Sequence, residues 1–165
     1  MMIYLLDANV LINANRDYYS IARVPEYWDW LQFNGESGHI KIPLEIYEEI
    51  SDGNDDLSEW AKLLQTKTAL LFQEEVDHAM VQWVTYQGYM PDPDDVDIEK
   101  IGRDPFLISY AGIDIPNRCI VTTEVSKPSK QGSNKHIPDV CHQLGIFWCD
   151  PFEMYRRLNF RTNWR

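Results

Sequence analysis

The side chains best placed to do chemistry in this chain are acids that fall where predicted strands end or helices begin. The clearest is Asp7, which interrupts an apolar run from Met2 to Ile12. Such a run is typical of a buried strand, and an ionised carboxylate is costly to bury unless it is paired, hydrogen-bonded or bound to a cation. In an open α/β sheet, ligands bind at the carboxyl ends of the strands. Asp7 therefore indicates a ligand-binding edge.

Three more acids share this placement at a strand end or in a helix next to one: Glu49, Asp104 and Glu124. Glu45 lies one turn before Glu49 on the same predicted helix face and is a second candidate. Taken singly, Asp104 before Pro105 could be a helix N-cap, and the glutamates could be solvated surface. Gathered at one edge, however, the carboxylates would repel one another unless protons or a cation neutralised them.

Clustered carboxylates of this kind predict a divalent metal site. Hard oxygen ligands suit Mg²⁺ or Mn²⁺, and one or two such ions can polarise a phosphodiester and generate a hydroxide nucleophile. No P-loop, GxGxxG motif or Ser-His-Asp order offers a rival chemistry. A phosphatase with an Asp nucleophile would want a second acid at position 9, which is Asn9. The acidic stretch 92–99 lacks the Gly and spacing of an EF-hand, and we interpret it as a solvated turn.

Strands alternate with helices along the whole chain, and this alternation predicts the fold. Strands are expected at 2–6, 39–42, 119–123 and 145–149, and helices at 24–35, 44–51, 57–66, 76–86, 105–111 and 150–158. The stretch 68–72 is ambiguous between strand and helix, and 88–97 is expected to be a loop. The pattern indicates a three-layer α/β/α sandwich with a central, mainly parallel sheet, in one domain over 1–165 with its core at 2–158.

The charge distribution leaves a nucleic-acid partner open despite a net charge of −11. Residues 1–117 carry 7 basic and 22 acidic side chains, whereas residues 118–165 carry 8 basic and 4 acidic ones. Lys127, Lys130 and Lys135 follow Glu124 closely, where an RNA backbone would pass if the site binds RNA, although the sequence alone favours a solvated loop. The tail 156–165 mixes Arg with aromatic residues and could bind single strands or dock on a partner.

The composition of the chain also indicates the cellular compartment of the protein. The three cysteines form no CxxC pair, and we expect free thiols in a reducing cytoplasm. No apolar stretch approaches the roughly 18 residues of a membrane span, and no basic segment precedes the first apolar run. We therefore expect a cytoplasmic protein without a signal peptide or a membrane partner.

Four short segments, in order along the chain, resemble the motifs of PIN domains, the nuclease fold of VapC-type toxins. They are Tyr4 to Ile12, Ile42 to Ile50, Arg103 to Ala111 and Val121 to Glu124. The register of the second motif selects Glu49, flanked by Ile46 and Ile50, and in the fourth Glu124 stands where Asp is usual. After Glu124 a longer basic loop leads to Ile-Pro-Asp-Val-Cys141, which resembles an uncharacterised PIN-like branch of bacterial proteins.

This resemblance implies a metal-dependent endoribonuclease in which Asp7, Glu49, Asp104 and Glu124 hold one or two Mg²⁺ or Mn²⁺ ions. Asp139 could be a further acid of the metal site or a helix cap. The resemblance also implies a toxin restrained by an antitoxin encoded nearby, and a homodimer. Two alternatives remain: a PIN-like protein-interaction module without nuclease activity, and a metal-dependent nuclease directed at DNA.

Overall fold

Four short strands form one all-parallel sheet in the order β2-β1-β3-β4. The computed structural model describes residues 1–165. The strands are β1 (Ile3–Leu6), β2 (Ile40–Lys41), β3 (Arg118–Val121) and β4 (Phe147–Cys149). Leu5 is paired with Lys41 on one side and with Ile120 on the other. The central strands are buried on both faces, as expected when helices cover a parallel sheet.

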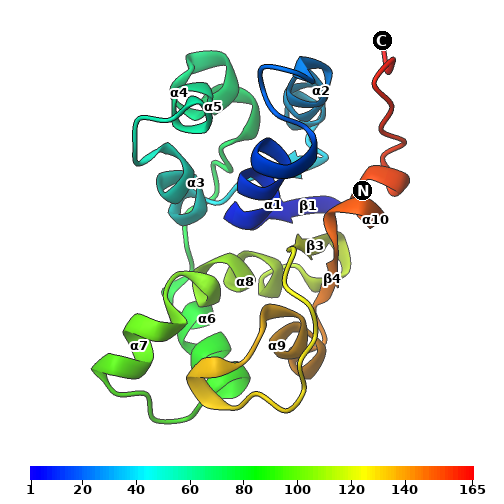
Figure 1. Ribbon diagram of the computed structural model, residues 1–165. Coiled ribbons are helices and arrows are strands. Elements are labelled where there is room, and N and C mark those ends of the chain that lie inside the picture. Colours follow the sequence, from blue (N-terminus) through cyan, green and yellow to red (C-terminus); the bar gives the residue numbers. More distant parts are fainter.

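Helices cover both faces of the sheet, which confirms the predicted α/β fold with three layers (Figure 1). The helices of the first half lie on one side: α1 (Ala8–Asn13), η1 (Ala14–Tyr18), α2 (Pro25–Glu36), α3 (Leu44–Ser51), α4 (Asp56–Lys62) and α5 (Leu64–Leu70). On the other side lie α6 (His78–Trp83), η2 (Val84–Tyr89), α7 (Asp95–Ile101), α8 (Asp104–Gly112) and α9 (Ile137–Leu144). The remaining elements are η3 (Ile115–Asn117), η4 (Gly132–Asn134) and α10 (Pro151–Arg157). No helix is long and apolar enough to cross a membrane.

The strand order creates a topological switch point at the carboxyl ends of β1 and β3. From β1 the chain crosses to β2 on one side, and from β3 it crosses to β4 on the other. Connections that leave two neighbouring parallel strands in opposite directions open a space at their carboxyl ends, and ligands of α/β proteins bind at such switch points. Asp7 directly follows β1, and Glu124 follows β3 after two threonines. The topology therefore brings these two acids to the same switch point.

Several predicted elements have different bounds in the structure. We expected a loop at 88–97, and this prediction is wrong from Asp95 onwards, where α7 begins. The acidic stretch 92–99, which we interpreted as a solvated turn, is largely helical. The reason is a capping box: Asp94 Oδ1 accepts from the backbone N–H of Asp97, and Asp97 Oδ2 accepts from that of Asp94. The expected helix 57–66 breaks at Leu63, because α5 turns to pack against α2.

The aromatic residues of the basic tail serve the fold. Just before the tail, Tyr155 of α10 is buried, and its hydroxyl shares a 2.6 Å hydrogen bond with that of Tyr27 of α2. Phe160 packs edge-on against the same Tyr27 ring, and Trp164 Nε1 donates to the Glu26 carbonyl at 2.9 Å. These rings are committed to covering α2, so the structure does not favour the expectation that the tail stacks on single strands. The three cysteines are free and buried.

Candidate metal centre

Asp7 is held rigidly at the end of β1 by three hydrogen bonds. Its side chain is 6% exposed and caps α1 by accepting from the Ala8 N–H at 2.8 Å. Its second oxygen accepts from Thr122 Oγ1 at 2.9 Å and from Asn9 Nδ2 at 3.0 Å. Burial raises the pKa of Asp7 to about 6, because these hydrogen bonds only partly offset the loss of water and the nearby charges of Glu124 and Glu49 raise it further.

Asn9 and Thr122 tie the ends of β1 and β3 together. The Asn9 carboxamide accepts from the Thr123 N–H at 3.0 Å while it donates to Asp7. Thr122 is fully buried, and its hydroxyl accepts from the Glu124 N–H at 3.2 Å while it donates to Asp7. One hydrogen-bond network therefore joins the carboxylate of Asp7, which follows β1, to the backbone of Glu124, which follows β3. Sequence reasoning gave neither residue a role, although the Asp-x-Asn spacing and the Thr-Thr-Glu motif were visible.

Asp104 is recessed but receives no hydrogen bond from the protein. It is the first residue of α8, whose N-cap is Arg103, so the alternative interpretation of Asp104 as an N-cap is wrong. Burial raises the pKa of Asp104 to about 8, and the charges of Asp7, Glu124 and Glu49 add to the rise. An acid shifted this far by loss of water and by like charges needs either a proton or an external cation.

Glu124 and Glu49 are more exposed than Asp7, and the charges of both act on it. Glu124 is half-buried, and its Oε1 accepts a long, 3.4 Å hydrogen bond from the Ile137 N–H at the start of α9. Burial raises its pKa, and the N–H of Ile137 and the charge of His136 oppose that rise. Glu49 is exposed on α3, and its pKa is raised by partial loss of water against the opposing charge of Arg103.

The four acids thus lie close enough at the switch point for their charges to raise the pKa values of Asp7 and Asp104. No Lys, Arg or His forms an ion pair with any of them. None of them belongs to the six ion pairs of the structure. No group of three or more His, Cys, Asp or Glu side chains lies close enough to enclose a metal ion as it stands. The donor set nevertheless fits Mg²⁺ or Mn²⁺, because these ions bind through one or two carboxylates and complete their shells with other oxygens.

The chain matches one known protein family. The model of a family described as "Domain of unknown function (DUF4411)" matches residues 4–162. The chain belongs to this family. No curated protein and no solved structure matches it. The matched range of the DUF4411 domain includes all four acids, and the family description names no activity, so the function rests on the geometry of the site.

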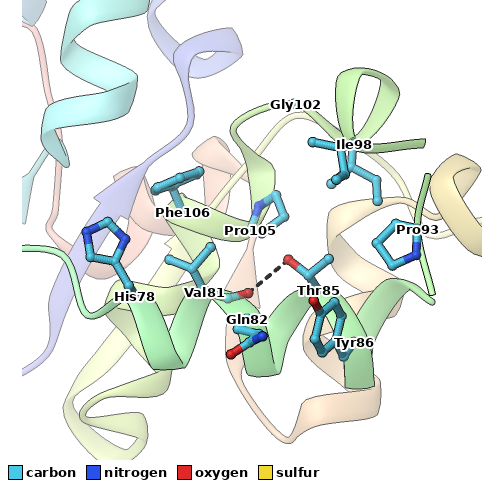
Figure 2. Close-up of a pocket in the computed structure, with 11 residues that line it drawn as sticks. His78, Val81, Gln82, Thr85, Tyr86, Pro93, Ile98, Gly102, Pro105 and Phe106 are labelled. Carbon is cyan, nitrogen blue, oxygen red and sulfur yellow. Dashed lines mark hydrogen bonds between the residues drawn. The ribbon is translucent and has the colours of Figure 1, made fainter. Parts of the chain in front are cut away.

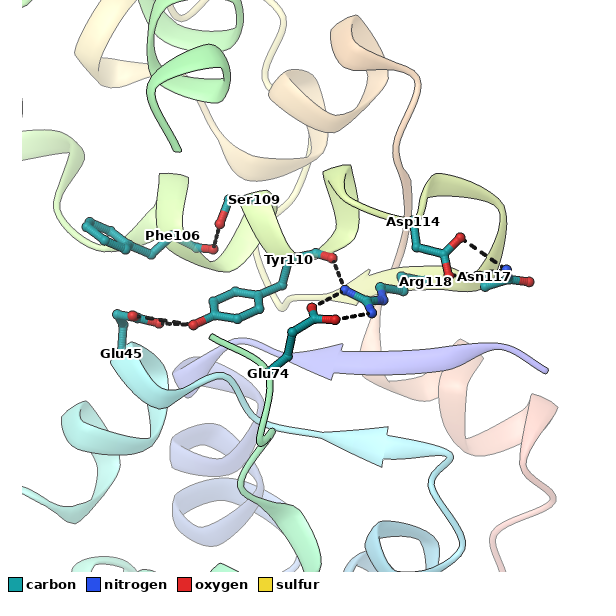
Figure 3. Close-up of polar contacts among 8 residues, drawn as sticks. All are labelled: Glu45, Glu74, Phe106, Ser109, Tyr110, Asp114, Asn117 and Arg118. Atoms are coloured by element: carbon teal, nitrogen blue, oxygen red, sulfur yellow. Dashed lines mark hydrogen bonds and ion pairs between the residues drawn. The ribbon is translucent and has the colours of Figure 1, made fainter. Parts of the chain in front are cut away.

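Two second-rank acids of this DUF4411 domain are engaged elsewhere. Glu45 accepts from Tyr110 Oη at 2.9 Å, which joins α3 to α8 (Figure 3). Asp139 is in the first turn of α9, where His136 is the N-cap, so Asp139 is not the cap. Its oxygens accept from Ser126 Oγ at 2.5 Å and the Lys127 N–H at 2.8 Å. These contacts favour Glu49 over Glu45 as the helix acid and give Asp139 a role in anchoring the loop beside Glu124.

The DUF4411 domain also has a cavity of about 450 Å³ between α6, α7 and the start of α8 (Figure 2). Its lining contains no carboxylate and includes His78, Tyr86 and Phe106. It adjoins the backbone on either side of Asp104 through Gly102 and Pro105. The acids are therefore not part of this cavity, and it plays no part in the metal centre.

Proposed function

We propose that the chain is a divalent-metal-dependent endoribonuclease of the PIN-like type. The observation that carries the proposal is the pair Asp7 and Asp104, two recessed carboxylates that form no ion pair within the protein. Burial raises the pKa of both, and the charge of Asp7 raises that of Asp104 further. The order of the four PIN-like motifs supports the same reaction class. One or two Mg²⁺ or Mn²⁺ ions would neutralise these acids, polarise the phosphodiester and supply a hydroxide nucleophile at neutral pH.

The chain's own residues would divide the remaining work. Asn9 and Thr122 orient Asp7 by hydrogen bonds, as the outer partners of a metal ligand commonly do. Glu124 and Glu49 have raised pKa values, and this brings them nearer to the range in which a carboxylate exchanges protons with water at neutral pH. The reaction would need no covalent intermediate, since water is the nucleophile.

The loop 125–136 supports a nucleic acid as the substrate. It carries three lysines and no acid in a chain of net charge −11. A cavity of about 510 Å³ lies against it, lined by Lys130, Lys135, His142 and Trp148 among others. Lys135 Nζ is bonded to the Gly88 carbonyl and to Gln143, whereas Lys130 has no ion pair. A free cation beside a half-buried indole can take one phosphate and one base of a single strand.

We extend the proposal to a biological role as the toxin of a toxin–antitoxin pair, on the strength of the motif resemblance. This role predicts growth arrest when the wild-type chain is expressed alone, and normal growth with an Asp104→Asn variant at the same level. It also predicts a co-purifying partner encoded nearby. A homodimer is part of the same proposal and is measured by the mass of the purified protein in solution.

The direct test is cleavage of a labelled single-stranded RNA of about 20 nucleotides by purified protein with Mn²⁺, Mg²⁺ or a chelator. We expect metal-dependent cleavage by the wild type and none by Asp7→Asn or Asp104→Asn. The matched control is Asp114→Asn, because Asp114 is half-buried, bonds to Asn117 and lies at the opposite end of β3 (Figure 3). Equal cleavage by all variants would remove these acids from the mechanism.

The same assay separates the rival functions. Cleavage of a matched DNA strand but not of RNA would identify a DNA-directed nuclease. No cleavage by folded protein, together with no thermal shift in Mn²⁺, would favour an interaction module. For the loop, Lys130→Glu should weaken RNA binding, whereas Lys67→Glu on α5 reverses the same charge outside the loop and should leave it unchanged.

A further inference from the structure

One buried hydroxyl near the acids has no hydrogen-bond partner within the protein. Tyr89 is 4% exposed, and its Oη is one of two buried side-chain polar atoms without a partner, the other being Arg118 Nε. Other buried tyrosines are satisfied: Tyr47 Oη, for example, donates to the Ala61 carbonyl at 2.6 Å. Leaving a buried hydroxyl unpaired is costly, so each such group in a folded protein calls for an explanation.

The local fold fixes Tyr89 between the helices that begin at the site. It ends η2, a π-helical turn that packs against α8 and α9. The Gln87 carbonyl accepts from Gln143 of α9 at 2.6 Å, and the Gly88 carbonyl accepts from Lys135 at 2.9 Å. A Cβ at Gly88 would lie 2.7 Å from Val140, so glycine permits this close approach of η2 to α9. Single π-helical turns within helices frequently occur at functional sites.

The charges that act on this hydroxyl are those of the site. Burial raises the pKa of Tyr89 well above its ordinary value, and after burial the largest contribution is the negative charge of Asp104, followed by Glu124. Asp104 in turn receives no hydrogen bond from the protein. The hydroxyl of Tyr89 is thus a buried donor without an acceptor, on a turn that packs against α8. Asp104, the first residue of α8, is an acceptor without a donor.

We propose that Tyr89 is a positioning residue for the metal centre, whose hydroxyl donates to Asp104 when that carboxylate engages a divalent cation. This inference rests on the proposed function. A ligating carboxylate is usually oriented by an outer hydrogen bond, and removing that partner typically lowers metal affinity or activity about 10- to 100-fold. The enclosed hydroxyl is not open to substrate, so its effect passes through Asp104.

The test compares Tyr89→Phe with Tyr47→Phe, since each variant loses only a hydroxyl from a buried ring. Mn²⁺ affinity is measured from the electron-paramagnetic-resonance signal of the free ion, and stability from the melting temperature of metal-free protein. For Tyr89→Phe we expect about a tenfold higher Kd for Mn²⁺ and a metal-free melting temperature that is unchanged or raised. For Tyr47→Phe we expect an unchanged Kd and a melting temperature about 3 °C lower.

A double-mutant cycle identifies the residue through which Tyr89 acts. Tyr89→Phe should raise the Mn²⁺ Kd in the wild-type background but not in an Asp104→Asn background. A Kd within twofold of wild type, equal effects in both backgrounds, or a metal-free loss of stability matching Tyr47→Phe would overturn the role of Tyr89 alone. Absence of Mn²⁺ binding by the wild type would instead overturn the proposed metal centre, and the inference with it.

Discussion

The two ends of the sheet hold carboxylates in opposite ways. At the amino end, Glu74 accepts from Arg118 Nη1 at 2.6 Å and Nη2 at 2.9 Å, in a two-pronged ion pair (Figure 3). Arg118 Nη1 also donates to the Tyr110 carbonyl, and its guanidinium lies 5.1 Å from the Phe72 ring centroid. At the carboxyl end, Asp7 and Asp104 lie in a recessed site with no such cation.

Helix α8 spans both arrangements, with Asp104 at its first residue and the Tyr110 carbonyl near its last turn. The acid of the amino end is neutralised within the chain and contributes to a fixed structure. The acids of the carboxyl end have no such partner within the chain, and under the proposed function a divalent cation would neutralise them. The comparison therefore separates a charge that stabilises the fold from charges that we assign to the proposed function.

The largest expected effect concerns Asp104→Asn. It should lower RNA cleavage by about 10³-fold, the scale of losing one electrostatic contact to a transition state, without lowering the stability of the metal-free protein. The asparagine removes a carboxylate that like charges already disfavour. Urea unfolding in a chelator measures the second part. A large loss of metal-free stability would show that Asp104 is structural, as Glu74 is.

The second-largest effect should come from the amino end of the sheet, where Arg118 pairs with Glu74. Replacing Arg118 by Met should cost about 1.5–3 kcal/mol of unfolding free energy, because half-buried Glu74 would lose two charge-assisted hydrogen bonds. The stability gained on adding Mn²⁺ should be retained. The control is Arg16→Met, whose ion pair with Asp17 is exposed and should contribute less than about 1 kcal/mol. Equal losses in the two variants would erase the contrast between a buried and an exposed pair.

The two acids at the carboxyl end of the sheet should also make the stability of the metal-free protein depend on pH. The pKa values of Asp7 and Asp104, about 6 and about 8, exceed that of an unfolded Asp, about 3.9. The folded protein therefore binds more protons than the unfolded chain between about pH 4 and 8, and its metal-free stability should fall as pH rises through that window. Asp104→Asn should flatten the upper part of the curve, which thermal melts from pH 4 to 9 would show.

The smallest effect should separate Glu49 from Glu45. Glu49→Gln should lower cleavage about tenfold, equivalent to about 1.4 kcal/mol of barrier, because its charge acts on both recessed acids. Glu45→Gln keeps an acceptor for Tyr110 and should change cleavage less than twofold. The reverse order would make Glu45 the helix acid.

Local sequence patterns predicted most of the helices and strands, but they did not predict which strand ends are joined by hydrogen bonds. Apolar strands and i, i+3, i+4 spacing indicated α3 at residues 44–51, α2 within a residue or so, and an α/β sheet. The helix α7 was missed because four aspartates and two prolines resemble a loop, whereas Asp94 and Asp97 cap a helix.

The site was predictable only in part, for a physical reason. Asp7, Asp104 and Glu124 could be named because they occur at boundaries that alternation brings to one edge. Tyr89 could not, since no local pattern signals an unpaired hydroxyl at the end of a π-helical turn. Asn9 and Thr122 act across 113 residues, and such long-range partners follow from strand order rather than from spacing.

The separation of β1 from β3 in the chain has a consequence for synthesis. Asp7 is synthesised well before Thr122, because the hydrogen bond between them joins positions 115 residues apart, and Asn9 and Thr123 are 114 residues apart. Parallel pairing at such distances is slow, because loop closure must precede the contacts that stabilise it. The hydrogen-bond network at the switch point can form only after Thr122 and Thr123 have been synthesised. A nascent chain that has not reached Thr122 therefore carries Asp7 and Asp104 without the partner that orients Asp7.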